Sequence, residues 1–157
     1  MSTHQIFGLI GNLDPRLETI RLLKEKFGSV IQEHSLLQPM MKILKNAGLP
    51  LIQNNCRQRS AMATAMRNLE SIFPRLSTSI LADTLTIEYL STDQTIVVVH
   101  DIYTTDESRW INANGGVIIG VSWHEYPCPS EWPENIDPYT IIKPNDIFSI
   151  IKPQFIE

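Results

Sequence analysis

The sequence lacks the features that mark several broad classes of protein. It has only two cysteines in 157 residues, Cys56 and Cys128, without a CxxC pair or a His/Cys cluster. This argues against a disulfide framework and a zinc site, and predicts reduced thiols in a cytoplasmic setting. No apolar run reaches the roughly 18 residues of a membrane span, and the N-terminus shows no signal-peptide pattern. A formal net charge of only −4 gives no electrostatic reason to expect nucleic acid or a membrane surface as partner.

What the sequence does contain is a regular alternation of strand and helix patterns. At 43% hydrophobic content, residues 1–157 are expected to form a single domain with its own core. Two β-branched runs, 95–99 and 117–121, are typical of strands buried on both faces of a parallel sheet. The alternation predicts an α/β fold with a mainly parallel sheet. The expected strands are 5–10, 30–33, 95–99, 117–121 and 139–142, and the expected helices are 16–27, 38–46, 57–72, 76–91, 106–113 and 146–151.

The expected strand ends point to one place for a ligand. In open parallel sheets ligands bind in the crevice outside the carboxyl ends of the strands. The segments that follow the three central strands are 11–17, 100–106 and 122–132. We therefore expect these three segments to line one crevice.

The first of these segments has the layout of a phosphate-binding loop without its chemistry. A Walker A site is a strand, a loop G-x-x-x-x-G-K-[ST] and a helix, with a lysine that carries positive charge to the phosphates. Gly8 and Gly11 are present, and Thr19 stands near the hydroxyl position. Arg16 and Leu17 occupy the places of the second glycine and the lysine. Leucine cannot neutralise a phosphate.

Three groups of motifs, in order along the chain, resemble one known family. Residues 8–19 lie without a gap over G-L-T-G-x-x-G-S-G-K-D-T, and residues 97–111 with Gly115-Gly116 are similar to a strand, D-V-R-F-x-x-E, a helix and G-G. Residues 129–131 and 136–139, ahead of Asn145-Asp146, are similar to an S-E turn and a last strand before N-[DG]. On these motifs the chain resembles the phage-type deoxynucleoside monophosphate (dNMP) kinases, P-loop proteins that move phosphate from ATP to a dNMP. The resemblance implies a P-loop kinase-like three-layer sandwich.

The chain departs from the family where the phosphates would bind. Besides Arg16 and Leu17, Asp14 replaces a loop glycine and Tyr103 replaces the arginine of D-V-R. The family's A-D-P-L-K segment falls on residues 37–42, where its lysine becomes Met41 unless the register slips by one. Phosphoryl transfer depends on positive charge around the phosphates, and each lost stabiliser costs about 3 kcal/mol. The departures together predict a degenerate kinase.

The resemblance supplies most of the candidate site residues, and a proline-rich segment supplies one more. Asp101 is the catalytic candidate, in the place of a carboxylate that holds Mg²⁺ or contacts substrate, although it is equally a turn or capping aspartate. Arg67, in a segment similar to G-T-x-x-x-R, is either a monophosphate ligand or part of a solvated helix face. Trp132, in a proline-rich segment, is either a partner-binding anchor or part of a stiff loop that closes the fold. The candidate nucleotide-binding residues are Gly8, Gly11, Arg16, Thr19, Arg67 and Asp101; no metal site is expected.

Several functions remain open from the sequence. The leading hypothesis is a phage-encoded pseudoenzyme in the host cytoplasm that acts by binding a host protein or a nucleotide. The alternative is an active dNMP kinase with an atypical loop, which would need ATP and Mg²⁺ and would use Arg16 or Lys24 for charge. Further possibilities are a nucleotide sponge that binds a dNMP without turnover and a pure protein-interaction module.

Overall fold

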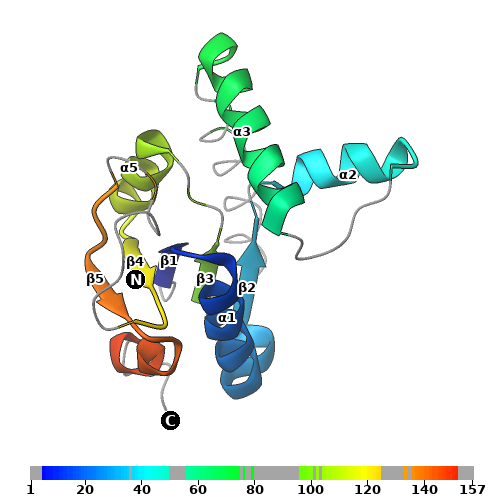
Figure 1. Cartoon of the computed structure of the whole chain (residues 1–157). Helices are drawn as coiled ribbons and strands as arrows, with labels where there is room; N and C mark the ends of the chain where they lie inside the picture. Colours follow the sequence, from blue (N-terminus) through cyan, green and yellow to red (C-terminus); the bar gives the residue numbers. More distant parts are fainter. Residues whose placement is uncertain are drawn as a thin grey trace.

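The chain forms a parallel sheet flanked by helices (Figure 1). The computed structural model describes residues 5–35, 37–49, 56–74, 76, 79, 96–100, 102, 104–124, 133 and 136–151. Its strands are β1 (Gln5–Ile10), β2 (Ile31–His34), β3 (Ile96–Val99), β4 (Val117–Val121) and β5 (Thr140–Ile142). Its helices are α1 (Leu13–Phe27), α2 (Gln38–Asn46), α3 (Cys56–Ile72) and α5 (Thr105–Ala113), with the 3₁₀ helices η1 (Gly28–Val30) and η3 (Pro144–Ile150).

All five strands are parallel, in the order β2-β3-β1-β4-β5. The central strand β1 is buried along its whole length. Its side chains alternate, as the period of a strand requires. Phe7 and Leu9 face α1 and η3, whereas Ile6 and Ile10 face α5. Helices therefore cover both faces, and the α/β class with a parallel sheet is confirmed.

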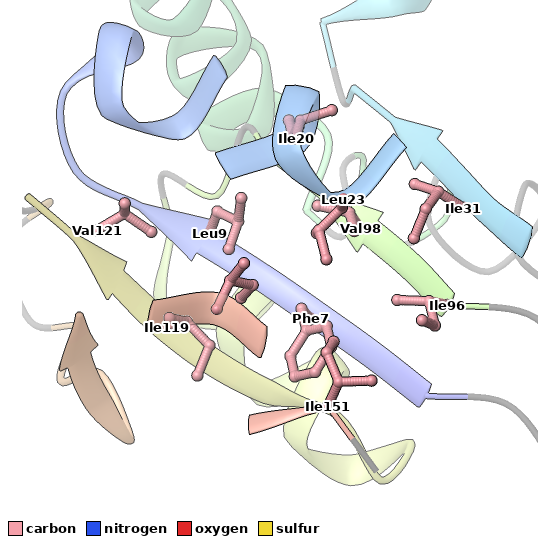
Figure 2. Close-up of a cluster of buried hydrophobic side chains, with 11 residues drawn as sticks. Phe7, Leu9, Ile20, Leu23, Ile31, Ile96, Val98, Ile119, Val121 and Ile151 are labelled. Atoms are coloured by element: carbon pink, nitrogen blue, oxygen red, sulfur yellow. The ribbon is translucent and has the colours of Figure 1, made fainter. Parts of the chain in front are cut away.

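The core has two parts, one on each face of the sheet. The larger part lies on the face that α1 and η3 cover. Figure 2 shows Phe7 and Leu9 of β1 beside Ile119 and Val121 of β4, with Ile20 of α1 over the sheet. Burying an aliphatic or aromatic side chain of this size contributes about 1.5–3 kcal/mol. This packing holds α1 on one face of the sheet, and the first residues of α1 follow the C-terminal end of β1.

Helices α2 and α3 form a separate arm that extends from the body of the sheet (Figure 1). They pack on each other through Leu37, Met62 and Ala63, with Met41, Leu44 and Met66 at the margin. We refer to α2 and α3 together as the arm. In the part of the chain that the structure describes, no helix is long and apolar enough to cross a membrane.

Most element boundaries agree with the sequence predictions within one residue, with two exceptions. Helix α1 begins at Leu13 rather than at 16, and the closing helix is the 3₁₀ helix Pro144–Ile150 rather than a helix over 146–151. The expected helix at 76–91 lies almost wholly outside the described residues. The early start of α1 changes the interpretation of the site.

Candidate functional site

The connection from β1 to α1 is a turn of two residues. Gly11 has φ 127°, a conformation that favours glycine, and Asn12 is the N-cap of α1. The residues aligned with the rest of the phosphate loop, 13–17, form the first turns of the helix. Leu13 and Pro15 are buried there, and Pro15 has no N–H to offer a ligand. An extended loop that wraps around phosphates is therefore absent between β1 and α1.

Arg16 closes this turn with its side chain. It is only 6% exposed, and its Nε donates to Gly11 O at 2.9 Å and to Asn12 O at 3.4 Å. Its Nη1 donates to the backbone oxygen of His100, just after β3. These are hydrogen bonds from a charged donor, the stronger class. The guanidinium thus joins the carboxyl ends of two neighbouring strands, at the position where a nucleotide's phosphates would be expected.

Two other candidate residues near this turn have structural contacts. Thr19 is fully buried, and its Oγ1 donates to Pro15 O at 2.8 Å within α1. Gly8 lies inside β1, where an added Cβ would come within 2.7 Å of Ile118 Cδ1 and 3.2 Å of Ile102 Cγ1. Both residues are thus explained by helix geometry and core packing, without a ligand.

A second charged cluster lies beside Arg16. The backbone of His100 donates to His34 O at 3.2 Å, and its side-chain Nε2 lies 3.2 Å from Glu33 Oε1. Lys24 of α1 donates to Glu33 Oε2. The hydrogen bond with His100 lowers the pKa of Glu33 most; partial burial opposes this, and Lys24 lowers it further, to about 2. Sequence reasoning missed this cluster, although Glu33 is the last residue of the expected strand 30–33 and lies at the same edge.

The remaining candidates are not all brought to this edge. Arg67 is exposed on α3 and donates to Thr64 Oγ1 at 3.4 Å, within its own helix. Asp101, Tyr103 and Trp132 lie outside the described residues. Of the three segments expected to line one crevice, the contact from Arg16 to His100 joins the first two. The third begins at Ser122, at the end of β4 next to β1.

The charged side chains described at this edge of the sheet form ion pairs and hydrogen bonds within the protein. Arg16 is directed at backbone carbonyls, and Lys24 and His100 are directed at Glu33. Among the residues that the structure describes, there is no group of three or more His, Cys, Asp or Glu side chains that could hold a metal ion. No protein-family model matches this chain, and no curated protein matches it.

Proposed function

We propose that this protein is a degenerate relative of the phage-type dNMP kinases that acts by binding, and that it does not transfer phosphate. The observation that carries the proposal is the set of hydrogen bonds from Arg16 to the carbonyls of Gly11, Asn12 and His100. A guanidinium with these partners takes the place of the loop that would hold the phosphates of ATP.

The active-kinase alternative needs a free cation, and the two that it invokes are engaged. To reach a phosphate, Arg16 would have to leave its carbonyl partners, at a cost of about 1.5–3 kcal/mol for a hydrogen bond to a charged group. Those carbonyl oxygens would then face the anion and repel it. Lys24 would have to leave Glu33, whose low pKa keeps it negative at neutral pH. The geometry therefore favours binding without ATP chemistry.

Calorimetric titration with ATP–Mg²⁺ and with each of the four dNMPs tests the proposal, together with an assay for dNDP formation. We expect no heat and no product with ATP–Mg²⁺. The double variant Arg16→Gly/Leu17→Lys restores the Gly-Lys pair of the motif. It should remain silent, because residues 13–17 are helical rather than looped. Tight binding of ATP–Mg²⁺ by the natural chain, lost in Arg16→Ala, would instead support an active kinase.

A nucleotide sponge is a second candidate, favoured by one observation. Arg67 is exposed, and its one hydrogen bond among the described contacts is a long one to Thr64. A sponge would bind a dNMP stoichiometrically in the same titration, and the affinity would fall in Arg67→Ala. Arg57→Ala, an exposed arginine on the same helix, is the matched control. Silence with every nucleotide would leave a host protein as the partner class.

A further inference from the structure

The outer edge of β5 has no partner strand in the part of the chain that the structure describes (Figure 1). Ser122 N donates to Ile142 O at 3.1 Å, so the backbone polar groups of Ile142 face β4. Those of the neighbouring Ile141 then face away from the sheet, because successive residues of a strand direct these groups to opposite sides. An exposed strand edge of this kind can pair with another chain.

The side chains around β5 alternate in exposure. Asp137, Tyr139, Ile141 and Lys143 are exposed, and Tyr139 is 78% exposed. The residues between them are less exposed, and Ile142 packs against the core beside η3. Lys143 continues β5 in an extended conformation. The alternation has the two-residue period of an extended chain, which places the exposed side chains on one side of it. We call these four exposed residues the edge patch.

Along the chain, the edge patch has the order acid, aromatic, aliphatic and base. Within the described residues, neither Asp137 nor Lys143 forms an ion pair. A second copy in antiparallel orientation sets each Asp137 against a Lys143 and each Tyr139 against an Ile141, whereas a parallel copy sets like charge against like. Opposite charges and aromatic–β-branched pairs stabilise neighbouring strands, and like charges destabilise them. The edge patch is therefore complementary to itself in the antiparallel orientation.

We propose that two copies of this chain form a dimer by antiparallel pairing of their β5 strands, with the two-fold axis at Thr140. Each Ile141, whose backbone faces out of the sheet, then lies opposite Tyr139 of the second copy. Each Lys143 lies near Asp137 of the second copy. The chain bends at Tyr139, and the long, flexible stem of lysine spans the displacement of Asp137 that results. The dimer depends neither on a nucleotide nor on a host protein.

The prolines on either side of β5 fit a pairing that is short and closed. Pro138 and Pro144 have no N–H to donate, so backbone pairing is confined to residues 139–143. A two-fold contact uses the same edge of both copies, which leaves neither β5 edge open to a third chain. Prolines and a lysine can also protect an edge from any pairing. In that case the chain is a monomer, which is the outcome that the first experiment must exclude.

Sedimentation equilibrium from about 1 μM to about 500 μM protein tests the dimer by mass action. Because the contact is short, we expect a weak monomer–dimer equilibrium with a dissociation constant of about 10–200 μM. The measurement uses the natural chain without nucleotide. A chain that stays monomeric up to the highest concentration overturns the proposal.

Charge variants of the edge patch test its orientation. Lys143→Glu sets two carboxylates against each other at both ends of the contact, so the dissociation constant should rise at least about tenfold. The swap Asp137→Lys/Lys143→Asp restores opposite charges across the contact and should return it to within about threefold of the natural value. A swap that binds as weakly as Lys143→Glu contradicts the antiparallel arrangement.

A matched control separates this contact from a general effect of charge. Lys42→Glu, at an exposed position of the arm, changes the net charge as much as Lys143→Glu does. It should leave the dimer intact, and a loss equal to that of Lys143→Glu would place the contact elsewhere. All of these variants change exposed side chains, and circular dichroism checks that they fold.

A cysteine at the proposed axis tests the register. The backbone of Thr140 faces β4, so across the axis it forms a non-hydrogen-bonded pair, whose Cα atoms lie about 4.5 Å apart, within the disulfide range of about 4.4–6.8 Å. On mild oxidation, Thr140→Cys should therefore form a linked dimer at least about tenfold faster than Ser149→Cys, at an exposed position of η3. The natural chain, oxidised in parallel, gives the background from its two cysteines. Equal rates in the two variants would overturn the pairing at Thr140.

Discussion

Two of the helices that begin at the C-terminal edge of the sheet, α1 and α5, start in different ways. At α5, Thr104 Oγ1 accepts from Glu107 N at 3.2 Å, and Glu107 Oε1 accepts from Thr104 N at 3.1 Å. This reciprocal pair is a capping box. At α1, the N-cap Asn12 makes no side-chain capping bond. Arg16 holds that turn instead, through Gly11 and the distant His100.

The difference separates local from tertiary control of a helix start. The capping box of α5 is contained in four consecutive residues, so it can form as soon as the helix does. The bond from Arg16 to His100 spans 84 residues and exists only when β1 and β3 are paired. Removing the capping box should destabilise the start of α5 alone. Removing the Arg16 side chain should weaken the connection between the carboxyl ends of β1 and β3.

The largest expected effect is from Arg16→Ala. It removes a buried charged donor from the carbonyls of Gly11, Asn12 and His100. We expect the free energy of unfolding to fall by about 3 kcal/mol, since hydrogen bonds to charged groups contribute about 1.5–3 kcal/mol each. Urea unfolding followed by circular dichroism measures the change. Arg16→Lys should recover only part of it, because an ammonium cannot reproduce the planar fork of a guanidinium.

Arg21→Ala is the matched control in the same helix. Arg21 forms ion pairs with Glu18 at 2.6 Å and Glu25 at 2.8 Å, all on the exposed surface. Exposed ion pairs contribute little to stability, so the loss should be much smaller than for Arg16→Ala. Equal losses in the two variants would show that Arg16 is not a tertiary join.

A smaller effect is expected from Thr104→Ala at α5. Losing an N-cap threonine costs about 1 kcal/mol. The same urea titration measures the loss of stability. In the Thr104→Ala variant, amide exchange should become faster than in the natural chain in the first turn of α5, and should change less at α1. Glu107→Gln should keep most of the stability, because an amide oxygen can also accept from Thr104 N. A Glu107→Gln loss larger than that of Thr104→Ala would contradict the capping box as the origin of the effect.

This contrast also explains which parts of the fold could be predicted from the sequence. The β-branched runs at β3 and β4 and the helix pattern of α5 depend on neighbouring residues, and their predicted boundaries are correct within one residue. The start of α1 was predicted three residues too late, because the resemblance to a phosphate loop implied a loop there. The local signals, an N-cap residue at Asn12 and an acidic first turn at Asp14, favour the earlier start that the structure has.

The candidate site was less accessible to sequence reasoning. Arg16 was identified as a candidate cation, but its partners are backbone carbonyls, which carry no sequence signature. The cluster of Lys24, Glu33 and His100 joins α1, β2 and the residue after β3, and depends on the order of the strands in the sheet. Asp101 and Trp132 lie outside the described residues, so their roles stay predictions.

An effect no larger than that of Thr104→Ala should come from acid titration of Glu33, the carboxylate that pairs with His100 and Lys24 beside Arg16. Its pKa is lowered from 4.5 to about 2 in the folded protein, so folding stabilises the ionised form. That stability is fully present above pH 4.5 and is lost as the pH falls from 4.5 towards 2. We expect about 1 kcal/mol, well below the full linkage value, because solvent screens a side chain that is 28% exposed. Urea unfolding of the natural chain and of Glu33→Gln between pH 7 and pH 3 measures it, and the difference between them should shrink below pH 4.5. A difference that stays constant with pH would mean that the ion pairs of Glu33 do not stabilise this edge of the sheet.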